Sequence, residues 1–176
     1  MRGHALARDD AHDLWELDAQ GRAALVAVRV VSGPFVDLAG HTIAYVRASQ
    51  TGTYELWVYD GVATRRLERS LAQAFAIRFD DRGERIVFAG ARNGGWTGLW
   101  TVRVARGPAR CLSNCDLRAG DPRNLSLTRP AADLDTLRVG VDSVSYVDEH
   151  GVATSLSYET TPLLPTSGVT TVRGTP

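Results

Sequence analysis

A repeat of 43 residues constrains the fold of this chain more than any other feature. When the sequence is compared with itself at that spacing, seven identities fall within the 21 positions from 37 to 57, without a gap. Tyr45 also meets Phe88, so an aromatic position is kept. The identical pairs are Asp37 and Asp80, Gly40 and Gly83, Ile43 and Ile86, Ala48 and Ala91, Gly52 and Gly95, Leu56 and Leu99, and Trp57 and Trp100. A period of about 20 to 50 residues indicates one supersecondary unit repeated along the chain.

Parts of the same unit occur before and after the two matched segments. The Leu-Trp pair of positions 56–57 and 99–100 is also found at 14–15. The tetrapeptide Gly-Val-Ala-Thr at 61–64 recurs at 151–154, in both places after a short aromatic segment that ends in Asp. The chain is therefore interpreted as half a repeat, two full repeats and one degenerate repeat.

Each repeat has the pattern of β-strands. The segments 42–46 and 85–89 are short and rich in β-branched and aromatic residues, and each is followed by turn residues. Both faces of these strands are apolar, which predicts a sheet packed between two neighbouring sheets. The segments 37–40 and 80–83 begin with Asp and end with Gly, as tight hairpins do. No segment shows a sustained helical period, so the predicted fold is all-β.

Four strands in a repeat of about 43 residues are typical of a β-propeller blade. We expect an N-terminal extension at 1–12, blades of four antiparallel strands at 13–158, and a Thr/Pro-rich tail or linker at 159–176. The propeller segment holds only three to four blades, whereas known rings have about four to eight. Either it closes a very small ring, or it is an incomplete ring that further blades or another chain complete. We expect the second arrangement.

The blade resembles the TolB-type, WD-repeat-like family. The segment 79–88, which reads Phe-Asp-Asp-Arg-Gly-Glu-Arg-Ile-Val-Phe, is the best match, and 56–67 supplies the following strands. The resemblance covers residues 13 to 120 well and 121 to 158 poorly. The Ser-Pro that usually precedes the Asp-Gly turn in this family is absent, because Phe79-Asp80 stands there. The resemblance implies a propeller fold and implies little about function.

Composition and charge exclude several classes of function. The chain has 176 residues, and its 20 basic residues balance 20 acidic ones, so no nucleic-acid partner is expected. The longest apolar segment, 23–31, is too short to cross a bilayer. The segment 1–13 is charged and lacks the apolar core of a signal peptide.

The two cysteines, Cys111 and Cys115, are separated by three residues. They form either a local disulfide or two free thiols; zinc is not favoured, because two further ligands are missing nearby. We predict the disulfide, which requires an oxidising compartment. The TolB resemblance implies the same compartment, so a periplasmic or secreted location is expected.

No catalytic, cofactor-binding or metal-binding residues are predicted. The four histidines lack zinc-site spacing, no Gly-x-Ser-x-Gly elbow occurs, and Asp133 and Asp135 lack the rest of a calcium loop. Arg92, Asn93 and Trp96 in a Gly-rich turn are candidate partner-binding residues, since Trp and Arg dominate interface hot spots; Trp96 could equally cap its own hairpin. Three arginines on an outer strand form either a solvated face or a phosphate site: Arg65, Arg66 and Arg69.

Two functions fit these predictions. The first is a non-catalytic propeller module that binds a protein or peptide through its loops. The alternative is the propeller domain of a larger prolyl-oligopeptidase-like peptidase, whose catalytic triad would lie on a separate hydrolase domain. A third function, that of a sugar-processing or lactonase propeller, is less favoured, because the sequence offers no convincing set of inward-facing His, Asp or Glu residues.

Overall fold

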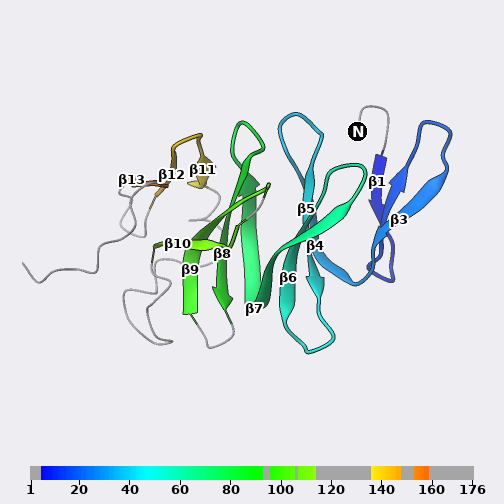
Figure 1. Ribbon diagram of the computed structural model, residues 1–176, viewed down its shortest axis with the longest axis horizontal. Coiled ribbons are helices and arrows are strands. Elements are labelled where there is room, and N and C mark those ends of the chain that lie inside the picture. The colour runs from blue at the N-terminus through cyan, green and yellow to red at the C-terminus, as the bar shows by residue number, and fades with distance from the viewer. Residues whose placement is uncertain (1–4, 93–95, 106, 114–135, 148–152, 159–176) are drawn as a thin grey trace, which may run out of the picture.

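A computed structural model describes residues 5–92, 96–105, 107–113, 136–147 and 153–158 of the chain. The ordered elements in these ranges are β-strands arranged in three antiparallel sheets, and no α-helix occurs in them. Figure 1 shows the sheets side by side along the long axis, with β1–β3 at one end and β11–β13 at the other. The all-β prediction is therefore confirmed.

The N-terminal sheet contains β1 (Ala5–Arg8), β2 (Leu14–Leu17) and β3 (Ala23–Ala27), in that order. Its middle strand carries the first Leu-Trp pair of the repeat. Strand β1 lies in the segment that the sequence assigns to an extension, yet it pairs with β2 along its whole length, from Ala5 opposite Leu17 to Arg8 opposite Leu14. The first sheet therefore begins upstream of residue 13. Strand β1 provides hydrogen-bond partners for the backbone N–H and C=O groups of β2.

The central sheet has seven strands and contains both full repeats. In spatial order from β4 to β10, these are β4 (Val30–Val36), β5 (Ile43–Ala48), β6 (Tyr54–Tyr59), β7 (Thr64–Phe79), β8 (Arg85–Arg92), β9 (Trp96–Arg103) and β10 (Arg110–Ser113). Strand β7 pairs with β6 up to Leu71 and with β8 from Leu71 onward. It thus ends one blade and begins the next. We name the blade of β4, β5, β6 and the first half of β7 blade A, and that of the second half of β7 with β8–β10 blade B.

The C-terminal sheet contains β11 (Arg138–Val139), β12 (Ser143–Val147) and β13 (Ala153–Ser157). The hairpin from β12 to β13 is the second occurrence of the Gly-Val-Ala-Thr segment, and β6 and β7 form the first. The degenerate repeat therefore keeps an antiparallel hairpin at the expected place.

Three apolar clusters join these sheets, and the 43-residue register predicts which side chains enter each. Ile43 and Tyr45 of β5 face the N-terminal sheet, whereas the alternate residues Ala44 and Val46 face blade B. Strand β8 repeats this arrangement: Ile86 and Phe88 enter the cluster with blade A, and Val87 and Ala89 enter the cluster with the C-terminal sheet. Every one of these eight side chains is buried. Strands buried on both faces are what blade-on-blade packing requires.

The Asp-Gly hairpins of the two full blades have the same geometry. In each, the Gly amide donates to the Asp carbonyl at 3.0 Å, and Gly40 and Gly83 have φ of +70° and +69°. Oδ1 of Asp37 accepts the His41 amide at 2.7 Å, and Oδ1 of Asp80 accepts the Glu84 amide at 2.8 Å. The sequence prediction of these turns is confirmed.

The two glycines differ in their surroundings, which yields a prediction. A Cβ at Gly83 would lie 2.8 Å from Oδ2 of the buried Asp37, whereas a Cβ at Gly40 would have no atom within 4 Å. We expect Gly40→Ala to lower the free energy of unfolding by about 1–2 kcal/mol, the cost of a left-handed backbone. Gly83→Ala should cost a further 1–3 kcal/mol or so, because Asp37 must shift. Urea titrations that gave equal losses would contradict this contact between hairpins.

No helix in the described part of the chain is long and apolar enough to cross a bilayer.

Candidate functional site

The predicted partner-binding residues lie at the hairpin between β8 and β9. Arg92 ends β8, Trp96 begins β9, and the two are paired across the hairpin. Asn93 lies outside the described residues, as do the side chains of Arg92 and Trp96. The backbone therefore brings Arg92 and Trp96 together, and their role in binding stays a prediction.

The cysteine pair is only partly covered by the structure. Cys111 lies in β10, half-buried against the cluster between blades A and B, and Cys115 lies outside the described residues. We expect both thiols to resist maleimide labelling in native protein isolated without reductant, and to react after reduction. Labelling of both residues before reduction would contradict the disulfide, and would remove the main reason for expecting an oxidising compartment.

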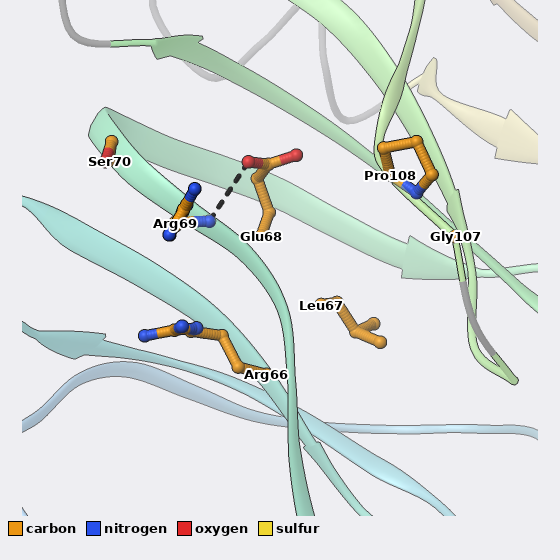
Figure 2. A pocket seen from close by; sticks show the side chains of 7 residues that line it. All are labelled: Arg66, Leu67, Glu68, Arg69, Ser70, Gly107 and Pro108. Carbon is orange, nitrogen blue, oxygen red and sulfur yellow. Dashed lines mark hydrogen bonds between the residues drawn. The ribbon is translucent and has the colours of Figure 1, made fainter.

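Arg66 and Arg69 of β7 line a cleft of about 510 Å³ between that strand and the Gly107–Pro108 segment. Figure 2 shows Arg66, Glu68 and Arg69 along the strand, with Pro108 across the opening. Arg66 forms an ion pair with Glu55 at 2.9 Å, and Arg65 donates to the Ala105 carbonyl at 2.9 Å. Because these two guanidinium groups already have partners within the chain, the geometry favours a structural role for them over a phosphate site.

Glu68 stabilises the same cleft through the backbone. One of its carboxylate oxygens accepts the Arg69 amide at 3.0 Å, the contact drawn as a dashed line in Figure 2. The other accepts the Ala109 amide at 3.3 Å. The second bond ties the Gly107–Ala109 segment of blade B to blade A, so this carboxylate holds the cleft in shape.

A buried tyrosine–glutamate pair joins the N-terminal sheet to blade A. Tyr59 donates its phenol hydrogen to Glu16 at 2.6 Å, and Glu16 is buried. Burial, followed by the hydrogen bond to Glu16 and the negative charge of that carboxylate, raises the pKa of Tyr59 to about 12. The phenol therefore stays a neutral donor at physiological pH, and the pair acts as a link between sheets.

An apolar hollow lies between the Asp-Gly hairpins of the two full blades. Its volume is about 390 Å³, and its lining side chains are Phe35, Val36, Leu38, Ile77, Arg78, Phe79, Asp80 and Asp81. Two of the apolar ones are open to solvent: Val36 is 51% exposed and Leu38, at the hairpin tip, is 83% exposed. Sequence reasoning treated the first hairpin only as a turn. The available signal was the apolar Leu38 at a position where the second hairpin has the charged Asp81.

Among the described residues, no group of three or more His, Cys, Asp or Glu side chains could hold a metal ion. The structure thus adds no metal site to the hollow, the cleft or the hairpins within those ranges.

The sequence itself matches neither a protein-family model nor a curated protein. Solved structures do match. A TolB structure from Agrobacterium tumefaciens superposes with a TM-score of 0.51 at 14% identity, covering 82% of this chain and 49% of that one. TolB from Acinetobacter baumannii has a TM-score of 0.48 at 12% identity, with coverage of 89% and 40%.

The β-propeller domain of the Trilobed protease from Pyrococcus furiosus has a TM-score of 0.47 at 13% identity, with coverage of 61% and 36%. This chain thus spans less than half the length of all three matched chains. Its sheet order, the blade-on-blade packing and the Agrobacterium superposition agree on one architecture. The chain has the fold of a β-propeller, and its blades are similar to those of TolB.

Proposed function

We propose that this chain is a non-catalytic propeller module that binds a protein or peptide partner at the hairpin end of blades A and B. The observation that carries the proposal is Leu38, a large apolar side chain held 83% exposed at the rim of the apolar hollow. Single exposed apolar residues are ordinary on protein surfaces. Here, Leu38 and the half-exposed Val36 flank a hollow backed by Phe35 and Phe79.

The hairpin that presents Leu38 is fixed by hydrogen bonds and by a contact with the next hairpin. The preceding Asp37 is buried, accepts the His41 amide through Oδ1, and lies against Gly83 of the next hairpin. A preorganised anchor loses little conformational freedom when it binds, so more of its contact energy appears as affinity. Loops fixed on a rigid scaffold are where proteins commonly place binding residues.

The lining of the hollow fits a peptide. Its apolar part can take one or two hydrophobic side chains. The charged Arg78, Asp80 and Asp81 lie at the same hollow, and polar groups around an apolar centre are the usual anatomy of an interface. The expected ligand is therefore a segment with one or two apolar anchors and flanking polar groups.

A displayed peptide library tests the proposal. We expect selection on the immobilised chain to enrich peptides with an apolar anchor, and Leu38→Asp to weaken their binding at least about tenfold. Val62→Asp is the matched control, because Val62 is 91% exposed at another hairpin tip and does not line the hollow. Failure to enrich any peptide, or equal binding to both variants and the wild type, would contradict the proposal.

The proposal includes an extracytoplasmic location, periplasmic or secreted. Its support is the predicted bond between Cys111 and Cys115, since disulfides persist in oxidising compartments. The thiol-labelling experiment above is therefore also the first test of location.

A further inference from the structure

Three arginines gather on the face of blade B that meets the C-terminal sheet. Arg85 of β8 lies directly opposite Arg103 of β9, and Arg110 of β10 lies directly opposite Thr101 of β9. Together they line a hollow of about 680 Å³, whose other described lining residues are Gly107, Pro108, Val141, Asp142 and Tyr158. This hollow is distinct from the apolar hollow at Leu38, with which it shares no residue.

Thr101 also lines this hollow, and its hydroxyl group has no hydrogen-bond partner in the structure. The residue is 2% exposed, so this hydroxyl lies just beneath the surface of the hollow. Native proteins contain few buried polar groups without a partner. A small shift of the side chain would let the hydroxyl donate to a ligand oxygen.

Within the described residues, none of the three guanidinium groups forms an ion pair. Arg85 lies over the ring of Tyr158, at 4.2 Å from its centroid. Burial raises the pKa of Tyr158 to about 12, so the phenol is neutral and offers Arg85 no counter-charge.

Carboxylates lie near the three arginines, although none of them forms an ion pair with these arginines in the described residues. Asp142 is the one acidic residue among the described lining of the hollow. Asp80 and Glu84 line the adjoining hollow with Arg85 and Arg103, and Oδ1 of Asp80 accepts the backbone amides of Glu84 and Arg85. Like charges directly opposite each other on neighbouring strands are destabilising, so a bound anion would stabilise the pair of Arg85 and Arg103.

The blade architecture does not require these residues. At the positions 43 residues earlier, blade A has Thr42 in place of Arg85, Val58 in place of Thr101 and Asp60 in place of Arg103. Val58 is fully buried in an apolar cluster, and valine has nearly the shape of threonine without its hydroxyl. Blade A thus forms the corresponding strands with a valine at the position of Thr101 and without a basic residue at the positions of Arg85 and Arg103.

We infer that Arg85, Arg103, Arg110 and Thr101 form an oxyanion-binding site for a carboxylate or phosphate group. Arginine presents a planar fork of donors that matches both groups, and the Thr101 hydroxyl supplies a donor from the floor of the site. This oxyanion site is separate from the apolar hollow that is proposed above to bind a peptide. Its ligand is either a free small anion or an acidic side chain of a partner.

Calorimetric titration at low ionic strength tests the inference with two probes, inorganic phosphate and a capped peptide containing two successive glutamates. We expect at least one probe to bind the wild type and to bind about ten- to hundredfold more weakly to Arg103→Gln, which loses charge-assisted hydrogen bonds. Binding of phosphate alone identifies a free phosphate, and binding of the peptide alone identifies a partner's carboxylates; each supports the site.

Two variants separate binding from folding. Thr101→Val restores the residue of blade A, and we expect it to weaken binding severalfold while thermal stability is unchanged or increased, because an unpartnered hydroxyl is removed. Arg22→Gln removes an exposed charge in the N-terminal sheet and should leave binding unchanged. The inference is overturned if neither probe binds the wild type, or if Arg103→Gln and Thr101→Val bind like Arg22→Gln. Leu38→Asp should not affect this binding, so the two proposals can fail independently.

Discussion

Replacing Trp100 with alanine is expected to lower the free energy of unfolding by about 3–5 kcal/mol, and replacing Trp57 by only about 1–2 kcal/mol. The two residues are equivalent in the repeat, so the 43-residue register predicts that both rings are buried in the same way. The structure corrects this expectation. Trp100 is 6% exposed within the cluster between blades A and B, whereas Trp57 is half-buried at the edge of the cluster with the N-terminal sheet.

The difference is explained by the residue two positions after the one that pairs with each Trp on the neighbouring strand. This residue is Gly90 in blade B and Arg47 in blade A. At Gly90 the strand has no side chain, and a Cβ there would lie 2.7 Å from the Gln73 carbonyl oxygen. The indole of Trp100 donates to the Gly90 carbonyl at 3.0 Å. The equivalent residue in blade A is Arg47, whose guanidinium lies 5.2 Å from the centre of the Trp57 ring. Trp57 instead donates to Glu55, also at 3.0 Å.

Chemical denaturation of the two single variants measures this difference. Trp100→Ala leaves a cavity between two blades and a backbone carbonyl without its donor, whereas Trp57→Ala removes a ring that solvent already reaches. Trp57→Phe and Trp100→Phe are useful companions, because both keep an aromatic ring while losing the indole donor and part of the ring volume. Equal losses for the two alanine variants would mean that the burial difference is not present in solution.

The period of the sequence was sufficient to predict the strands at 42–46 and 85–89, which are β5 and β8 in the structure, and the alternation of their residues between two apolar faces. Successive side chains of a strand point to opposite faces, so assigning one residue to a face assigns all the others. It was not sufficient for Trp57, whose exposure depends on Arg47 and on how much of the N-terminal sheet covers it. Strand β1 was also missed, since Ala5–Arg8 has no repeat partner in the sequence and forms by pairing with β2.

The candidate sites were less predictable than the fold, for a physical reason. Arg65, Arg66 and Arg69 are close in the sequence and were noticed, yet two of them are engaged within the chain. Arg85, Arg103 and Arg110 lie on three different strands, and only the pairing of β8, β9 and β10 brings them onto one face. A sequence pattern reports neighbours along one strand more readily than neighbours across strands.

The second large expected effect concerns the outer face of the N-terminal sheet, which is the face turned away from blade A. Because Leu14 of β2 packs against blade A, the adjacent Trp15 points to the opposite face. Leu25 of β3 lies directly opposite Trp15 and is 51% exposed. In blades A and B the face that carries the equivalent Trp is covered by the preceding sheet. Figure 1 places the N-terminal and C-terminal sheets at opposite ends of the row, so neither covers the other in the described residues.

We therefore expect the chain on its own to expose this face, and to bind an apolar dye or to associate with another chain. The occupant that fits is a further blade packed as the N-terminal sheet packs on blade A, because a repeat unit that cannot bury its apolar face alone buries it against a neighbour. Leu25→Asp should reduce dye binding and shift the solution mass toward the monomer. Val62→Asp is the matched control and should change neither, because Val62 is 91% exposed at a hairpin tip and does not line the apolar hollow. If the wild-type chain is a monodisperse monomer that unfolds cooperatively and binds no dye, then its outer face is already covered and the incomplete-ring prediction is wrong.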